Sequence, residues 1–382
     1  MFLAGTKSGI IVDMKVVLVG PVYPYRGGIA HFTAALADAL ENQAVETTII
    51  SYRKLYPKFL YPGKDDKDLD EHSPDPEVKF IYSLFDFRDW QQTWRLIKEI
   101  SPDLVIFQWW VTAWSFAYQY IFKQLNKAGI RFKVIVHNAL PHEPRWYDVL
   151  LAKKVFALVP EVICLSDKEA KRLKTDLEYN GRVDVSPHPI YKGFGNSTKT
   201  REQYISEFGI KENDKIVLFF GIVRPYKGLG DLIETIGILR KKQIPVTLVV
   251  AGEFWMKEES FRSQINHLGI QENVKIVNRY IPDSEVAQYF ENSDLFVAPY
   301  VAGTQSGALK LAMGYGLPAV ITSVVADEMM SQRRDAIAIV PPSKPYLLAE
   351  AIAESLNSEK RKYSQQFGTK MSWETLTALI LN

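Results

Sequence analysis

Residues 216–229 read Ile-Val-Leu-Phe-Phe-Gly-Ile-Val-Arg-Pro-Tyr-Lys-Gly-Leu, an apolar run that passes through a glycine loop into a helix-period segment. A short apolar run bounded by glycine predicts a buried strand, and a helix after it is typical of parallel α/β units. The same order of strand, small-residue loop and helix occurs at 16–40 and at 295–315. Ligands of such sheets bind outside the carboxyl ends of the strands, so these three loops are the first candidates for a functional site.

Strands and helices alternate in both halves of the chain. Its 382 residues exceed the roughly 250–300 at which a single hydrophobic core stops growing, which favours two domains. Pro, Gly, Asn, Ser and Thr gather at 188–200, between the two alternations. We predict a doubly wound domain at 14–193, a second at 200–365, and a helix within 366–382 that packs back on the first. The predicted strands are Val16–Gly20, Thr47–Ser51, Val78–Tyr82, Leu104–Gln108, Lys133–His137, Glu161–Leu165, Ile216–Phe220, Val246–Ala251, Val274–Val277, Leu295–Ala298 and Ala319–Thr322.

The overall composition excludes several classes of protein. A formal net charge of +2 argues against dedicated nucleic-acid binding, which usually shows a strongly basic domain. Cys164 is the only cysteine, so no internal disulfide can form, and no Cys/His cluster has zinc spacing. No apolar run reaches the roughly 18 residues of a membrane span, and residues 1–13 lack a signal-peptide cleavage pattern. We therefore expect a cytoplasmic protein.

The loop after 216–220 carries two cations, Arg224 and Lys227, beside Gly228. Arginine offers a bidentate fork and lysine a compact point charge, so the pair suits a diphosphate. A leaving diphosphate gains negative charge in the transition state, and fixed cations beside it would lower the barrier. Two solvated surface cations are the alternative interpretation.

The other two loops offer amides and hydroxyls to an anion. Gly27 and Gly28 precede the first helix, where the backbone can approach a ligand closely and free amides face it. The pattern is not the GxGxxG dinucleotide fingerprint, and a plain tight turn is the alternative. Thr304, Ser306 and the amides near Gly307 suit phosphate oxygens, although either hydroxyl could be a helix N-cap.

Five motifs in this order resemble the family 4 retaining glycosyltransferases, which have the GT-B fold of two Rossmann-like domains facing each other across a cleft. The resemblance covers nearly the whole chain from Met14 onward. The motifs are the Gly27-Gly28 loop, His137-Asn138 with Pro141-His142-Glu143, Arg224 with Lys227-Gly228-Leu229, Asn278-Arg279-Tyr280-Ile281-Pro282, and Gly303–Pro318.

The resemblance implies roles for several of these residues. Gly27 and Gly28 would lie against the donor diphosphate and the acceptor, and His137 beside the donor sugar. The diphosphate would be held by Arg224 and Lys227. The segment that would border the nucleobase consists of Arg279, Tyr280 and Ile281.

The resemblance also implies a reaction. A sugar would pass from a UDP- or GDP-linked donor to a glycan or lipid-linked acceptor with retention, and without a protein nucleophile. The acceptor hydroxyl would attack the face that the diphosphate leaves. No metal and no further cofactor would be required if the two cations neutralise the diphosphate.

The chain departs from the family in one respect. The family pattern has two glutamates eight residues apart, and their places hold Gly303 and Leu311. Ribose recognition must then differ, through Glu253 or through backbone groups. Beside the sugar and phosphate, the run Thr304-Gln305-Ser306-Gly307 would take the place of the first glutamate.

Candidate acceptor residues follow two predicted strands. Trp109 and Trp110 come just after 104–108, and indole faces stack on sugars or lie at membrane interfaces. His142 and Glu143 lie in a loop that could reach the cleft. We read His188, between two prolines, as structural.

Two charged groups have competing interpretations. One is a basic segment that contains Lys168, Lys171, Arg172 and Lys174. It could contact anionic lipid, which would make the chain a peripheral membrane protein, or it could be a solvated helix face. Asp66, Asp68 and Asp70 mimic a metal-binding DxD motif, but a solvated acidic loop is the better interpretation because no strand positions them.

Three functions stay open at this point. The first is the glycosyltransferase. The second is a nucleotide-sugar epimerase on the same fold, which would need acid–base groups in the cleft. The third is a non-catalytic nucleotide-sugar-binding module, suggested by the missing glutamates.

Overall fold

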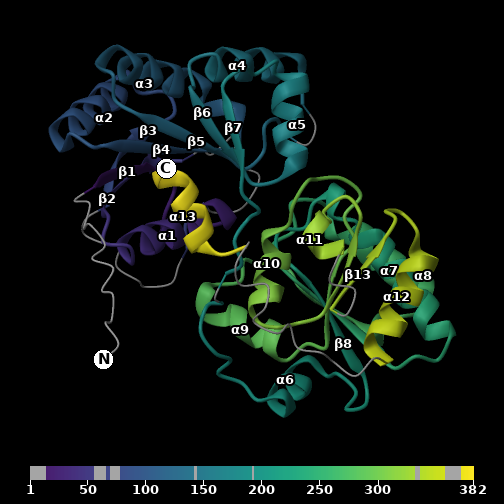
Figure 1. The fold of residues 1–382 in the computed structure, drawn as a ribbon. Helices are drawn as coiled ribbons and strands as arrows, with labels where there is room; N and C mark the ends of the chain where they lie inside the picture. Colours follow the sequence, from purple (N-terminus) through teal and green to yellow (C-terminus); the bar gives the residue numbers. More distant parts are fainter. Residues whose placement is uncertain are drawn as a thin grey trace, which may run out of the picture.

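The computed structural model describes residues 14–55, 66–68, 78–141, 144–191, 193–331, 336–357 and 371–382. They form two α/β domains, with the N-terminal domain above the C-terminal one in Figure 1. Each sheet is entirely parallel and carries helices on both faces, which confirms the predicted GT-B architecture. In the described part of the chain, no helix combines the length and the apolar character needed to cross a membrane.

The N-terminal sheet has seven strands in the order β3-β2-β1-β4-β5-β6-β7. The order reverses between β1 and β4, which creates the crevice where doubly wound sheets bind ligands. Its strands are β1 (Lys15–Val19), β2 (Glu46–Lys54), β3 (Lys79–Ser83), β4 (Leu104–Trp109), β5 (Phe132–Val136), β6 (Glu161–Cys164) and β7 (Arg182–Val185). Its helices are α1 (Gly28–Glu41), α2 (Phe87–Ile100), η2 (Thr112–Trp114), α3 (Ser115–Ala128), α4 (Trp146–Phe156) and α5 (Asp167–Asp176).

The C-terminal sheet has six strands in the order β10-β9-β8-β11-β12-β13, with its own reversal between β8 and β11. Its strands are β8 (Lys215–Phe220), β9 (Val246–Ala251), β10 (Val274–Val277), β11 (Leu295–Ala298), β12 (Ala319–Thr322) and β13 (Ile337–Val340). Its helices are α6 (Arg201–Phe208), η3 (Pro225–Lys227), α7 (Leu229–Lys241), α8 (Glu258–Leu268), η4 (Gln271–Asn273), α9 (Asp283–Glu291), α10 (Gly307–Gly314), α11 (Glu328–Ser331) and α12 (Pro345–Asn357). Every strand expected from the sequence is present, whereas β7 and β13 were not anticipated.

The last helix, α13 (Trp373–Leu381), follows the C-terminal domain in sequence but packs on α1 of the N-terminal domain. The carbonyl of Leu379 accepts a hydrogen bond from the buried Lys133 at 3.2 Å, and Gln43 contacts Thr377. Figure 1 shows α13 lying beside α1, beneath the N-terminal sheet. The chain therefore passes between the domains twice.

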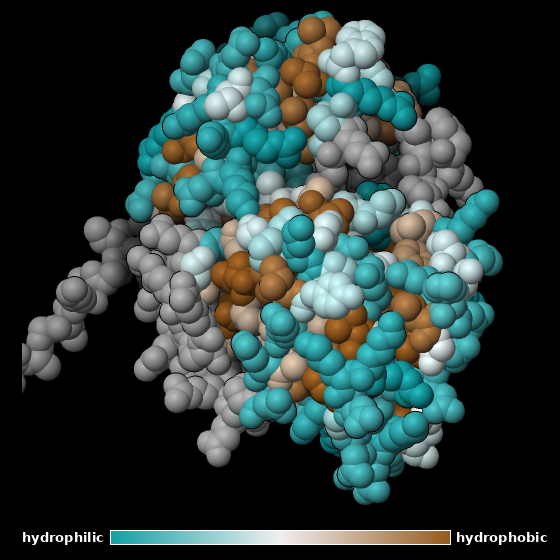
Figure 2. Space-filling model, turned by 90° about the vertical axis from the view of Figure 1, so that its right-hand side faces the viewer, coloured by the Kyte–Doolittle hydropathy of each residue, from teal (hydrophilic) through white to brown (hydrophobic). Residues whose placement is uncertain are grey.

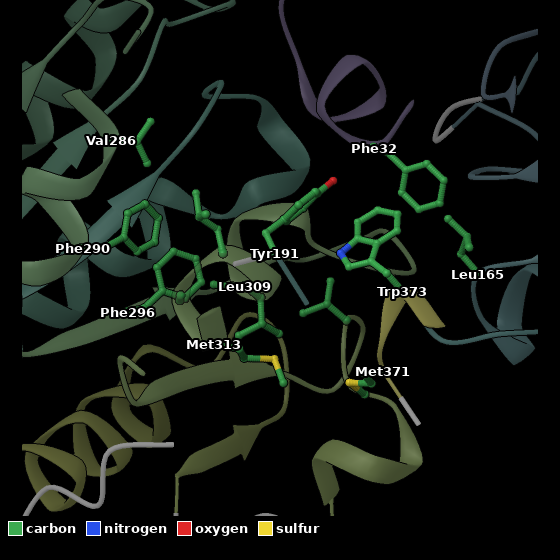
Figure 3. Close-up of a cluster of buried hydrophobic side chains, with 14 of the residues drawn as sticks. Phe32, Leu165, Tyr191, Val286, Phe290, Phe296, Leu309, Met313, Met371 and Trp373 are labelled. Atoms are coloured by element: carbon green, nitrogen blue, oxygen red, sulfur yellow. The ribbon is translucent and has the colours of Figure 1, made fainter. Parts of the chain in front are cut away.

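Buried apolar side chains from both domains form one continuous cluster. Tyr191, in the connection between the domains, lies at its centre, with Trp373 and Phe32 on one side and Leu309 on the other (Figure 3). The Phe32 and Trp373 rings are 5.1 Å apart, and those of Tyr191 and Trp373 are 5.9 Å apart. On the face of the molecule that Figure 2 shows, hydrophilic residues predominate and hydrophobic residues occur in small groups on both domains. The domain arrangement thus has an apolar core of its own.

Gly314 on α10 approaches this connection closely. A Cβ atom at Gly314 would lie 1.9 Å from the carbonyl oxygen of Tyr191, a backbone atom that cannot move aside alone. We predict that Gly314→Ala lowers the free energy of unfolding by about 1–3 kcal/mol, because the new methyl group separates α10 from the connection.

Urea denaturation of the variant and the wild type measures this difference. Gly230→Ala on α7 is the matched control, since its nearest neighbour would lie at an ordinary 3.6 Å. The control should gain up to about 1 kcal/mol from helix propensity. A Gly314→Ala protein as stable as that control would contradict the proposed close contact.

Candidate active site

The first loop leaves the backbone open to the cleft. Gly27 is the residue before α1 and has φ of 108°, a conformation that L side chains rarely adopt. No side chain caps α1 there, and a Cβ atom on Gly27 or Gly28 would have no atom within 4 Å. The Tyr191 hydroxyl donates to the Gly28 carbonyl at 3.3 Å, which ties this loop to the domain connection. The amides at the start of α1 are therefore presented to an anion.

His137 closes β5 and is almost completely buried. Its Nε2 lies 2.7 Å from Oε1 of Gln108, and its ring meets Phe32 edge to face at 4.7 Å. Burial, with a smaller effect of His188, lowers the pKa of His137 to about 3. At neutral pH the ring is uncharged and donates to Gln108 from Nε2. It can serve as a hydrogen-bonding group beside a sugar.

The second loop places its two cations differently. The guanidinium of Arg224 stacks on the Trp255 ring at 4.4 Å. Lys227 is buried, with Nζ 5.6 Å from the centre of the Tyr300 ring, and no carboxylate lies within 4 Å of it among the described residues. Burial and the nearby Arg224 lower the pKa of Lys227, while Tyr226 opposes them. A buried ammonium group without a counter-ion is costly, and a bound anion would remove that cost.

The third loop carries unsatisfied polar atoms. Ser306 is the N-cap of α10: its hydroxyl accepts from the amide of Leu309 at 3.2 Å. Thr304 is not the cap, and its buried Oγ1 has no hydrogen-bond partner among the residues that the structure describes; the same holds for Oε1 of Gln305. Gln305 donates from Nε2 to the carbonyl of His137 at 2.8 Å, across the domain boundary. Buried polar atoms normally have partners, so this loop is suited to ligand oxygens.

The structure shows the surroundings of the two positions at which the family pattern has glutamates. Gly303 has φ of 117°, where any side chain would be strained. Leu311 is buried in the apolar cluster that joins the domains. Glu253, the alternative ribose ligand, is also buried, and its Oε2 accepts from the Trp255 indole at 3.3 Å beside Arg224.

The segment expected at the nucleobase is engaged with protein groups. Arg279 forms a bidentate pair with Glu285 on α9. Tyr280 donates to Asp68 at 2.8 Å, and the guanidinium of Arg26 lies 4.2 Å above its ring. Ile281 is buried. The N-terminal domain thus contacts Tyr280 through Arg26, next to Gly27, and through Asp68.

Two expectations from the sequence are wrong. Asp68 is not a solvated loop carboxylate, because it is buried and accepts the Tyr280 hydroxyl across the domain boundary; Asp70 lies outside the described residues. Trp109 is not an exposed platform for an acceptor. β4 extends one residue further than predicted, and the fully buried indole donates to the carbonyl of Ala139.

The remaining candidates for acceptor binding, and His188, differ in burial and in whether the structure describes them. Trp110 follows β4 and is half-buried against Tyr52 and Trp114. His142 and Glu143 lie outside the described residues. His188 is buried, and its Nδ1 is 2.8 Å from the Pro189 carbonyl, as suits a structural residue.

Two residues of α5 make contacts that the sequence did not indicate. One binds the C-terminal domain, and the other binds the loop after His137. Lys168, expected on a solvated or lipid-facing helix, instead donates to the carbonyls of Ser323, Val324 and Ala326 in the C-terminal domain. The neighbouring Glu169 is fully buried and accepts the amide of Ala139 at 2.5 Å. Neither contact could be predicted from the sequence, because the lysine contacts depend on how the domains meet and the glutamate contact joins residues 30 positions apart.

A cavity of about 380 Å³ lies between the domains at this point. Its polar lining comes from the start of α5, the third loop and the turn after β12, and includes Lys168, His188, Thr304, Gln305, Lys310 and Asp327. Lys310 is buried, and its Nζ is 3.5 Å from Asp327. The polar groups of the cleft therefore continue beyond the third loop.

Two family descriptions match the chain, one in each domain. Glycosyltransferase Family 4 matches residues 26–191, and Glycosyl transferases group 1 matches residues 214–358. The chain belongs to the family 4 glycosyltransferases of GT-B fold. The family suggested by the sequence motifs is thereby confirmed.

A curated relative is similar to part of the chain, and solved structures share its fold. Spore coat protein SA of Bacillus subtilis is 25% identical over 226 residues, which cover 55% of this chain and 58% of that protein. The chain thus spans little more than half the length of that relative. HepE of Anabaena, solved in complex with UDP-glucose, has a TM-score of 0.72 at 15% identity, covering 96% of this chain and 98% of HepE. WaaG, a glycosyltransferase involved in lipopolysaccharide biosynthesis, has a TM-score of 0.63 at 14% identity, covering 96% and 99%.

The buried histidines predict how the stability of this family 4 chain depends on pH. Burial lowers the pKa of His137 to about 3 and that of His188 to about 4, from 6.5. The unfolded chain therefore takes up protons first, so stability is full above about pH 6.5 and is lost as the pH falls. We expect a loss of about 2 kcal/mol per histidine between pH 6.5 and 5.

Urea unfolding across this pH range tests the expectation. His188→Gln should give a shallower slope, whereas His267→Gln, at an exposed position on α8, should leave it unchanged. Identical slopes in all three proteins would mean that the buried histidines do not set the pH dependence.

Proposed function

We propose that this chain is a retaining glycosyltransferase that moves a sugar from a UDP- or GDP-linked donor to a glycan or lipid-linked acceptor, without a metal. The observation that carries the proposal is the buried ammonium of Lys227, which has no carboxylate within 4 Å in the described residues. Arg224 lies in the same loop, and the Gly27 loop and the start of α10 add helix amides. A diphosphate is the anion that would use all of these groups at once.

The proposed step needs charge stabilisation rather than a protein base. The acceptor oxygen forms a bond to the anomeric carbon while the bond from that carbon to the phosphate oxygen breaks. The proton of the acceptor hydroxyl passes to the leaving phosphate oxygen on the same face, so the anomeric configuration is retained. Arg224 and Lys227 would stabilise the charge that develops on the diphosphate.

His137 has a positioning role in this scheme. With a pKa of about 3 it stays neutral, which disfavours it as the acid–base group that an epimerase would need. Its carbonyl accepts from Gln305 of the opposite domain, so the sugar would lie where the two domains meet.

The nature of the donor and acceptor draws support from solved neighbours. HepE was solved with UDP-glucose, which supports a uridine donor here, and GDP stays an alternative. WaaG is involved in lipopolysaccharide biosynthesis, which supports a lipid-linked or polysaccharide acceptor.

The donor site predicts a specific behaviour of Lys227→Met. Removing an unpaired buried charge should leave the ligand-free protein as stable as the wild type or more stable. The same change should abolish stabilisation by UDP and GDP, because the diphosphate loses its buried counter-ion. Thermal melting with UDP, GDP, ADP and their sugar conjugates measures both effects.

Lys241→Gln, at an exposed position on α7, is the control and should behave as the wild type. Stabilisation by one nucleotide in the wild type identifies the donor base. Undiminished stabilisation in Lys227→Met would refute the diphosphate site. Binding without nucleotide release in the presence of any acceptor would favour the binding module instead.

The two cations also predict metal independence. We expect EDTA to change the rate of nucleotide release by less than about twofold, because the diphosphate charge is met by Arg224 and Lys227. A large loss that Mg²⁺ or Mn²⁺ restores would show that a metal shares this task.

A further inference from the structure

Exposed hydrophobic side chains are concentrated at one place on the N-terminal domain. Six of them occupy the beginnings of α2, α3 and α4, and we call this set the aromatic rim: Phe85, Phe87, Phe116, Trp146, Tyr147 and Leu150. Trp146 is 80% exposed, Phe85 64% and Phe116 60%. Large exposed apolar side chains gathered on neighbouring helices are typical of an interaction site.

The fold brings these three helix beginnings to one edge. α2 contacts α3, α3 contacts α4, and the three cover the outer face of the N-terminal sheet (Figure 1). The Phe87 ring at the start of α2 lies 5.1 Å from the ring of Tyr120, in the second turn of α3. Each helix follows the carboxyl end of a strand, the edge at which His137 also lies. The aromatic rim therefore lies at the same edge of the N-terminal sheet as His137.

The described beginnings of these helices expose two arginines and one carboxylate, a small excess of positive charge. Arg88 and Arg145 are exposed at the starts of α2 and α4. Two carboxylates of the same helices are turned inward: Asp89 pairs with Arg53 at 3.0 Å, and Asp148 accepts the amide of Arg145 at 2.9 Å. Among the described residues at these helix beginnings, Asp86, the N-cap of α2, is the carboxylate left exposed.

We propose that the aromatic rim docks this protein on the surface of an anionic lipid bilayer, with the mouth of the cleft against the headgroups. Phe and Leu side chains have no hydrogen-bonding groups for a sugar but insert readily among acyl chains, while Trp and Tyr favour the interface. The two arginines add attraction to anionic headgroups. A second copy of the chain fits less well, because a symmetric contact would bring the same arginines together.

Docking at the aromatic rim also indicates which class of acceptor the proposed reaction uses. This part of the inference rests on the proposed function. If sugar transfer occurs in the cleft, the acceptor is lipid-linked and reaches Trp110 from the membrane side. The basic residues of α5 are not needed for docking, and Lys168 is already engaged with the C-terminal domain.

The test is co-sedimentation of the full chain with vesicles of phosphatidylcholine alone and of phosphatidylcholine containing phosphatidylglycerol. The double variant Phe116→Ser/Trp146→Ser should bind the anionic vesicles at least about tenfold more weakly than the wild type, because two apolar side chains no longer insert. Arg88→Gln/Arg145→Gln should lower binding to anionic vesicles by about tenfold or more, with little effect on neutral ones.

The matched control removes two exposed apolar side chains from the other domain. Tyr346→Ser/Leu347→Ser on α12 changes residues that are 69% and 43% exposed and should bind as the wild type does. Three outcomes overturn the proposal: no wild-type binding to anionic vesicles at low ionic strength, equal losses in control and rim variants, or a dimer that the rim variant dissociates.

Thermal melting with UDP and GDP separates this proposal from the proposed function. The rim variant should keep the wild-type response to nucleotide. A wild type that binds vesicles but no nucleotide would refute the donor site and leave the docking surface standing.

Discussion

The packing of Tyr191 between Trp373 and the C-terminal domain is the contact on which the rest of the structure depends. Every group of the candidate site comes from a loop at the carboxyl end of a strand, and the loops belong to two separate sheets. The apolar cluster that both domains share holds these loops in place relative to one another, together with hydrogen bonds such as that of Gln305 to the His137 carbonyl. The Tyr191 hydroxyl also reaches the Gly28 carbonyl, so the same residue fixes the connection and the first loop.

The electrostatics of the cleft follow from this arrangement. Closing two sheets over polar loops removes water from them, which raises the cost of any charge left without a partner. Burial lowers the pKa of His137, so its ring stays neutral. Lys227 has no carboxylate within 4 Å in the described part of the chain, so the anionic ligand that we propose would compensate its charge. On this proposal, the site is most stable when the ligand is bound.

The strands with a clear apolar pattern were predicted from the sequence. A weakly patterned strand, the end of a fully buried strand and contacts between distant residues were missed. Buried central strands such as β9 and β11 were found at their true bounds, because apolar runs between glycine loops identify them. β7 reads Arg-Val-Asp-Val at a half-exposed edge, so its pattern is weak. Trp109 was misplaced because β4 is buried on both faces, and no alternation marks where it ends. Asp68, Lys168 and Glu169 find their partners far away in sequence or in the other domain, which spacing along the chain cannot show.

The return of α13 to the N-terminal domain has a consequence for how the molecule can be divided. A fragment that stops at the end of the first sheet would lack the helix that covers Phe32 and the α1 surface. The complementary fragment would carry α13 with nothing to pack on. The two domains are therefore separate in architecture but not in sequence, and a cleaner division would join α13 directly to the N-terminal half by rearranging the order of the chain.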